Sequence, residues 1–195
     1  DDSKSTDVLT AEQLNENEET AKENEKSGKN TSSHRRVPFA VVEAYKSIRT
    51  NLSFLLSNDN GGNVFAVTSA NAGEGKSTTA ANLAVAFSQL DKKILLIDAD
   101  MRRASLHKKF KVKNGEGLSN VLSGLTELDS SVKKLNSNLF LLTAGAIPPN
   151  PSELLDSKNF ADLIETASEK YDYVIIDTPP INVVSDCLVV APHTV

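Results

Sequence analysis

The 195-residue sequence carries 26 acidic and 21 basic side chains, which gives a formal net charge of −5 at pH 7. Residues 1–31 hold nine acidic and four basic residues, so they account for the whole excess and the rest of the chain is balanced. A balanced chain lacks the basic face or stripe that binds nucleic acid, which excludes nucleic acid as the main partner. The single cysteine, Cys187, cannot form an internal disulfide, which fits a reducing cytosol.

Membrane segments and leader sequences are the next features to consider. No apolar run approaches the roughly 20 residues that span a bilayer, and the first residues lack the basic start and apolar stretch of a signal peptide. We therefore expect a soluble, cytoplasmic chain. Because the sequence begins at Asp1 and its only methionine is Met101, we expect that an initiator or a longer preceding segment was removed. A membrane region upstream stays open as an alternative.

The first part of the chain divides into a tail and a helix. Residues 1–36 are rich in Glu, Asn, Ser and Lys and poor in apolar residues, which predicts a disordered acidic tail or linker. After Pro38, apolar residues recur at steps of four and three, which predicts a helix with one apolar stripe: Val41, Tyr45, Ile48, Leu52 and Leu55. Glu43 and Lys46 fall on its opposite face, and Gly61 and Gly62 lie in the loop that ends it.

Short apolar runs then alternate with helical patterns. The runs predict strands at 64–68, 94–97, 139–142 and 173–176, and the helical patterns cover 77–90 and 158–170. Runs of three to five apolar residues bounded by Gly, Pro or charge suit parallel strands that are buried on both faces. The sequence therefore predicts an α/β fold with a doubly wound, mostly parallel sheet and flanking helices, formed by one domain over 37–195.

A glycine-rich segment lies directly between the first predicted strand and the long helix after it. It reads Ser-Ala-Asn-Ala-Gly-Glu-Gly-Lys-Ser-Thr over 69–78. In such a loop, successive backbone N–H groups and the positive end of the helix dipole cradle phosphates. We therefore expect the nucleotide to be bound by Ala72, Gly73, Glu74, Gly75, Lys76, Ser77 and Thr78, with Lys76 on the β- and γ-phosphates and the Ser77 hydroxyl on Mg²⁺. Ala70 departs from the usual pattern, which has glycine there.

Three carboxylates follow the ends of predicted strands. Asp98 and Asp100 follow the run at 94–97, and Asp177 follows the run at 173–176. Ligands of open α/β sheets bind at the carboxyl ends of the strands, and an aspartate after four apolar residues is the Walker-B arrangement that holds Mg²⁺. Each aspartate alone is better explained as a polar strand end. Together with the glycine-rich loop, they predict a metal and phosphate site.

Four segments resemble bacterial protein-tyrosine kinases, the BY-kinase family of polysaccharide export. They are EAYKSIRTN at 43–51, ILLIDADMRR at 94–103, NPSELL at 150–155 and YDYVIIDTPP at 171–180. The resemblance covers roughly residues 38–193. It implies a P-loop kinase domain that uses ATP and Mg²⁺, autophosphorylates on tyrosine and regulates capsular or exopolysaccharide synthesis and export.

The resemblance also implies roles for single residues. Lys76 and Asp98 are the catalytic residues, with Asp98 accepting the tyrosine proton. Ser77, Asp100 and Asp177 hold the metal, and Arg102, together with Arg103, positions phosphates or neighbouring subunits.

The partners that the resemblance implies are protein tyrosine substrates, a transmembrane activator or polysaccharide co-polymerase, and further copies of the chain. Those copies form a ring through Glu43 and Arg49, which we expect to be exposed. The resemblance also implies a position at the inner face of the plasma membrane.

Some residues depart from the family pattern. Lys46 stands where the helix motif has arginine, and the three tyrosines, Tyr45, Tyr171 and Tyr173, form no acceptor cluster. The last strand and helix of the sheet are also missing, so we expect a domain that is incomplete at its C-terminus.

Two alternatives stay open. One is a partitioning-type ATPase switch, although such switches carry a signature lysine where this chain has Asn71. The other is an ATP-binding regulatory subunit without kinase activity.

Overall fold

A central β-sheet organises the fold in a computed structural model that describes residues 39–58 and 63–194, so the predicted tail at 1–36 lies outside the described residues. The five strands have the order β1-β5-β2-β4-β3, and all neighbours are parallel except the pair β3 and β4. This confirms the predicted α/β class. The strands are β1 Val64–Val67, β2 Ile94–Asp98, β3 Lys133–Lys134, β4 Leu139–Leu142 and β5 Tyr173–Asp177.

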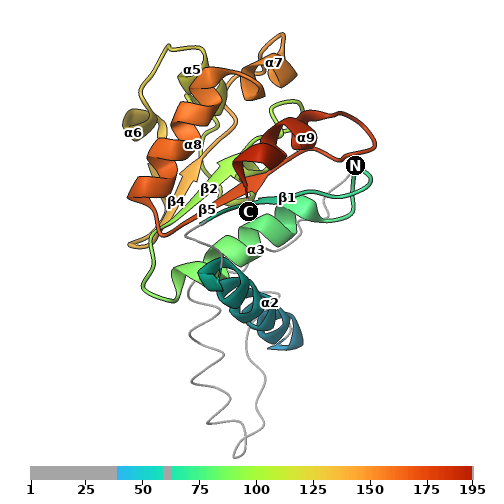
Figure 1. Ribbon diagram of the computed structural model, residues 1–195, viewed down its shortest axis with the longest axis vertical. Helices are drawn as coiled ribbons and strands as arrows, with labels where there is room; N and C mark the ends of the chain where they lie inside the picture. Colours follow the sequence, from blue (N-terminus) through green and yellow to red (C-terminus); the bar gives the residue numbers. More distant parts are fainter. Residues whose placement is uncertain (1–38, 59–62, 195) are drawn as a thin grey trace, which may run out of the picture.

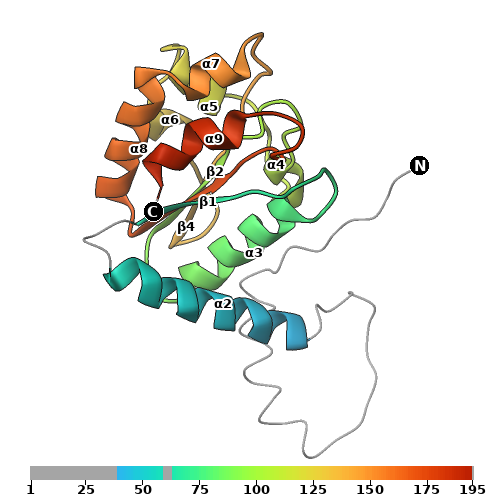
Figure 2. The same cartoon turned by 45° about the vertical axis from the view of Figure 1, so that its right-hand side comes forward.

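Helices cover both faces of the sheet (Figure 1). Helices α2 and α3 lie on one face, and α8 and α9 lie on the other, as the turned view also shows (Figure 2). No helix of the described part is long and apolar enough to cross a membrane. The helices are α2 Phe39–Asn58, α3 Lys76–Ser88, α4 Leu106–Lys109, α5 Leu118–Leu122, α6 Leu128–Ser131, α7 Pro151–Leu155, α8 Lys158–Lys170, α9 Asp186–Val190 and a 3₁₀ turn at Ala191–His193.

Strand β2 shows why the sheet is buried on both faces. Its four apolar residues, 94–97, are fully buried and alternate between two hydrophobic cores. Ile94 and Leu96 face α2 and α3, whereas Leu95 and Ile97 face the layer that contains α8. Successive side chains of a strand point to opposite faces, so an uninterrupted apolar run is required at this central position.

Helix α2 occurs where the apolar spacing predicted it, but its buried face differs from the predicted stripe. The side chains that pack on the core are Val42, Tyr45, Leu52 and Leu56. Val41, Ile48 and Leu55 of the predicted stripe are 37%, 43% and 65% exposed. The period was right, and Tyr45 and Leu52 of the predicted stripe do pack on the core. The other buried positions lie one residue further along the chain than predicted, and the inward face includes a charged residue that the apolar pattern left out.

That charged residue is Arg49, which the sequence analysis expected to be exposed. Its Nη1 donates a hydrogen bond to the Ala86 carbonyl at 2.8 Å, near the C-terminal end of α3. The last carbonyls of a helix have no partner within the helix and carry partial negative charge, so a guanidinium satisfies both needs. Arg49 therefore attaches α2 to α3, and the expectation of an exposed Arg49 is wrong. Glu43, by contrast, is about half exposed and pairs with Lys46 at 3.2 Å.

We expect Arg49→Met to lower the free energy of unfolding by about 1–2 kcal/mol, because a charged hydrogen bond to a helix end is lost. Urea denaturation measures this. The matched control is Glu43→Gln, which removes only a surface ion pair and should change stability by less than about 0.5 kcal/mol. Equal effects of the two substitutions would contradict the role of Arg49.

Candidate functional site

The glycine-rich loop joins β1 to α3 and has the backbone that anion binding requires. Gly73 and Gly75 have φ angles of 86° and 90°, in the left-handed region that disfavours residues with a side chain. Helix α3 begins at Lys76, directly after Gly75, and the Thr79 amide donates to the Gly75 carbonyl at 2.8 Å. The first amides of α3 and its positive dipole end therefore point into the loop, as in phosphate-binding loops.

Glu74 lies on the outer side of this loop. Both of its carboxylate oxygens accept hydrogen bonds from Asn71, one from the backbone amide at 3.1 Å and one from the side-chain amide at 2.9 Å. These bonds hold the pKa of the exposed Glu74 below its usual range. Glu74 thus fixes the shape of the loop, and Asn71 is engaged within its own loop.

The three aspartates predicted from the sequence lie at the carboxyl edge of the sheet, and two of them, Asp100 and Asp177, contact Lys76. Parallel pairing sets Asp98 of β2 beside Asp177 of β5. The Lys76 ammonium lies 2.9 Å from Asp100 Oδ2 and 3.6 Å from Asp177 Oδ1. Lys76 is mostly buried, so this lysine is turned inward onto the carboxylates.

Burial shifts the pKa of two of these aspartates upward. Burial raises the pKa of Asp98 to about 7, and the negative charge of Asp177 adds to this effect. The hydrogen bonds that Asp98 accepts from the Leu106 and Ser105 amides lower the pKa and so oppose it. Burial also raises the pKa of Asp177 to about 6, although the Lys76 charge opposes this. Asp98, Asp100 and Asp177 together therefore place more negative charge in this poorly solvated region than Lys76 alone offsets.

The donor set of this cluster fits a hard divalent cation. Both oxygens of Asp177 and the Oδ1 of Asp98 are buried without a hydrogen-bond partner, which is costly unless a cation or its water shell satisfies them. In the described part of the chain, no three His, Cys, Asp or Glu side chains gather in metal-binding geometry. Mg²⁺ takes one or two protein carboxylates and completes its shell with water and phosphate oxygens, so the buried oxygens of Asp177 are ligands of the type that it needs.

A cavity of about 310 Å³ opens above the glycine-rich loop. Most of the predicted site residues line it, namely Ala72, Gly73, Gly75, Lys76, Ser77, Thr78 and Asp100. Glu74, Asp98, Arg102 and Asp177 do not line it. Asp98 and Asp177 are fully buried beneath the residues that line the cavity, so a ligand contacts them only if it reaches past those residues.

Arg102 points to a different group of residues from the one the resemblance implies. Its Nε lies 3.4 Å from the buried carboxylate of Asp186, and its Nη2 donates to Ser152 Oγ at 3.0 Å. Ser152 in turn donates to Asp186 Oδ1 at 2.6 Å. Arg102 therefore joins the segment after β2 to α7 and α9, and the neighbouring Arg103 lines the cavity in its place.

The cavity also includes residues that sequence reasoning missed. Lys109 and Ser105 come from α4 and the residue before it, and Pro180 comes from the segment after β5. Their only sequence signal was position: a turn after the strand that carries Asp98, and the Pro-Pro pair after the strand that carries Asp177. Neither signal specifies which side chains reach the cavity.

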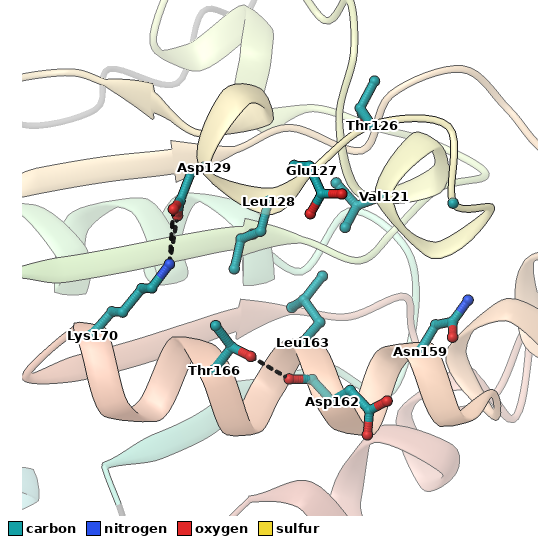
Figure 3. A pocket seen from close by; sticks show the side chains of 11 residues that line it. Val121, Thr126, Glu127, Leu128, Asp129, Asn159, Asp162, Leu163, Thr166 and Lys170 are labelled. Carbon is teal, nitrogen blue, oxygen red and sulfur yellow. Dashed lines mark hydrogen bonds and ion pairs between the residues drawn. The ribbon is translucent and has the colours of Figure 1, made fainter.

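A second cavity, of about 360 Å³, lies between α5, α6 and α8 (Figure 3). Lys170 and Asp129 reach toward each other across it, and the ammonium contacts both carboxylate oxygens, at 2.8 and 2.9 Å. None of the residues that line this cavity belongs to the glycine-rich loop, and none was predicted to bind the nucleotide, to bind metal or to take part in catalysis. The larger cavity is therefore not the candidate site.

A glycine-rich loop at the start of a helix, beside buried aspartates at the carboxyl ends of parallel strands, defines the P-loop nucleotide-binding proteins. The family described as "AAA domain" matches residues 62–193. Tyrosine-protein kinase YwqD of Bacillus subtilis is 50% identical over 145 residues, or 74% of this chain and 61% of that protein. Putative tyrosine-protein kinase CapB of Staphylococcus aureus is 41% identical over 160 residues, or 81% of this chain and 69% of CapB.

Solved structures agree with these matches. The kinase domain of the Escherichia coli tyrosine kinase ETK superimposes with a TM-score of 0.77 at 34% identity, covering 95% of this chain and 78% of that domain. The septum site-determining protein MinD of Pyrococcus horikoshii, complexed with Mg-ADP, is more distant, with a TM-score of 0.57 at 26% identity over 67% of this chain and 54% of MinD. The chain belongs to the family of bacterial tyrosine-protein kinases. It spans 61% of YwqD and 21% of the tyrosine-protein kinase wzc of Salmonella typhi.

We expect Asp98→Asn to stabilise the metal-free protein at pH 8 by an amount on the order of 2 kcal/mol. The raised pKa of Asp98 means that the folded state holds a proton that the unfolded state has already lost above pH 4. Stability therefore falls as the pH rises through this window, up to about pH 7, and asparagine removes that part of the slope. Urea denaturation between pH 5 and 8 with a chelator measures it.

The control for this pH series is Asp162→Asn, at an exposed position of α8. It should keep the wild-type dependence of stability on pH. If Asp98→Asn keeps that dependence too, the raised pKa of Asp98 is contradicted.

Proposed function

We propose that this chain is the catalytic domain of an ATP-dependent protein-tyrosine kinase that regulates the synthesis and export of capsular or extracellular polysaccharide. The observation that carries the proposal is the contact of Lys76 with Asp100 and Asp177 beneath the glycine-rich loop. Phosphoryl transfer depends on positioned positive charge and bound metal more than on covalent chemistry of the protein. A lysine, a metal-binding carboxylate cluster and a phosphate-binding loop supply these elements together.

In the proposed reaction, the tyrosine oxygen attacks the γ-phosphorus of ATP and the bond from that phosphorus to the β–γ bridging oxygen breaks, which releases ADP. Lys76 leaves its carboxylate partners to contact the β- and γ-phosphates, and the amides of residues 72–78 hold the phosphate chain. Ser77, Asp100 and Asp177 would hold Mg²⁺, which neutralises phosphate charge when it is bound. Of the two arginines that the resemblance assigns to phosphates or neighbouring subunits, Arg103 lines the cavity and takes the phosphate-facing role.

We propose Asp98 as the group that accepts the proton of the tyrosine hydroxyl. A pKa of about 7 suits a base that works near neutral pH, and the free Oδ1 offers a lone pair. Its burial means that the hydroxyl has to reach the floor of the cavity. The alternative role for Asp98 is structural, because its Oδ2 accepts the Ser105 and Leu106 amides at 3.1 and 3.0 Å.

The acceptor tyrosine belongs, in this proposal, to another protein or another copy of the chain. The ring of Tyr173 packs on Phe87 with ring centroids 4.7 Å apart, and that of Tyr171 packs on Phe140 at 5.4 Å. Tyr45 packs against the core beneath α2. We further propose a transmembrane activator as partner, at the inner face of the plasma membrane, and self-association into a ring.

The decisive experiment is phosphotyrosine formation on a tyrosine-containing acceptor peptide, with labelled ATP and Mg²⁺. We expect Lys76→Met to lower the rate by at least about 100-fold, because the phosphates lose their main cation. The control Lys108→Met removes an exposed lysine of α4 and should stay within about twofold. Circular dichroism checks folding, since the substitution leaves Asp100 and Asp177 without their cation. An unchanged rate in Lys76→Met would refute the kinase assignment, and ATP binding without transfer in the wild type would favour the regulatory subunit.

The metal site has its own test in Asp177→Asn. We expect the affinity for ADP to fall about tenfold in the presence of Mg²⁺ and to change little with a chelator, because only the metal-dependent part uses this carboxylate. Calorimetric titration under both conditions measures it. Equal losses under both conditions would show that Asp177 only maintains the fold.

A further inference from the structure

Lys109 contacts the glycine-rich loop, although it lies in a different segment of the chain. It is the last residue of α4, and its Nζ donates a hydrogen bond to Thr78 Oγ1 at 2.8 Å. Lys109 and Thr78 are both half-buried, and both line the cavity that contains Lys76 and Asp100. The cavity therefore holds a second lysine, from a segment 31 residues further along the chain.

We propose that Lys109 is a positioning residue of the nucleotide site, which fixes the Thr78 hydroxyl as a hydrogen-bond donor to a phosphate of the nucleotide. A threonine hydroxyl has one proton to donate and two lone pairs, whereas an ammonium can only donate. When Lys109 occupies a lone pair of Oγ1, the hydroxyl proton has to point to an acceptor elsewhere. This inference rests on the proposed nucleotide site, where Thr78 faces the phosphates.

The placement of Lys109 depends on Asp98. Two backbone amides at the start of α4, those of Ser105 and Leu106, donate to Asp98 Oδ2. Lys109 follows one turn later, so the carboxylate at the end of β2 sets the position of the helix that carries the ammonium. The short helix α4 thereby joins the acidic wall of the site to the phosphate loop.

Charge in the cavity favours the same role. Burial and the nearby Lys76 lower the pKa of Lys109, and the negative charge of Asp177 opposes this. A phosphate entering between the two lysines would add negative charge where two ammonium groups converge. The phosphate charge therefore keeps Lys109 charged, and so able to donate to Thr78, when the nucleotide binds.

Calorimetric titration of the wild-type chain with Mg-ADP tests the proposal. We expect Lys109→Met to weaken binding by about tenfold. Lys108→Met, which removes the exposed neighbour on the same helix, should stay within about twofold. Lys109→Arg should recover most of the loss, because arginine keeps a charged donor. Equal affinities of the Lys109→Met and Lys108→Met variants would overturn the proposal.

A double-mutant cycle separates positioning from bulk charge. Thr78→Val removes the hydroxyl, so adding Lys109→Met to it should cost less than about threefold if Lys109 acts through Thr78. If the fold loss in Mg-ADP affinity of the double variant equals the product of the two single losses, Lys109 acts independently of Thr78 and the positioning role is overturned. Melting without nucleotide identifies a variant that fails to fold, in which case Lys109→Arg and Thr78→Val decide. If the wild type itself does not bind Mg-ADP, the proposed function fails rather than this inference.

Discussion

The site depends on one electrostatic constraint: the ammonium of Lys76 contacts the buried carboxylates of Asp100 and Asp177, and a third buried carboxylate, that of Asp98, lies beside Asp177. The contact of Lys76 with Asp100 offsets one negative charge and part of another, and the remainder raises the pKa values of Asp98 and Asp177. Such a cluster destabilises the folded state in a low-dielectric interior unless further positive charge binds to it. For the same reason the cluster favours binding of a divalent cation. A bound cation would also take over part of the negative charge that Lys76 now pairs with, which leaves Lys76 able to exchange its carboxylate partners for phosphates.

Sheet topology creates this constraint. Strand β5 lies between β1 and β2, so the strand that ends in Asp177 is hydrogen-bonded on one side to the strand that ends in Asp98. On its other side is β1, which leads into the glycine-rich loop. Three segments that are far apart in the sequence thus end at the same edge of the sheet. The apolar residues before each aspartate hold the strands in a dry sheet, and the polar chemistry begins where those residues stop.

The four parallel strands and the glycine-rich loop could be predicted from the sequence, because buried parallel strands and glycine-rich turns leave local signals, whereas the two-residue strand β3, Lys133–Lys134, carries no apolar run and was missed. Other features depend on contacts between distant segments and left none. The sequence around Arg49 predicts an exposed charge, because the Ala86 carbonyl that it binds lies in a distant segment. Which of Arg102 and Arg103 faces the cavity could not be predicted either, since that depends on the position of Asp186. Lys109 belongs to a four-residue helix, which is too short to show a periodic pattern.

The segment after β5 has a consequence for sequence variation. The amides of Ile181 and Asn182 donate to the carbonyls of Ser69 and Ala70, so the pairing of backbone with backbone continues beyond the strands and along the start of the glycine-rich loop. Backbone bonds of this kind are indifferent to side-chain identity, and only proline removes the donor. Ile181 and Val183 are exposed beside the loop, 44% and 64% respectively. Related chains can therefore diverge at these two positions, and so acquire different exposed surfaces on the segment that pairs with the start of the loop, while the loop keeps its shape.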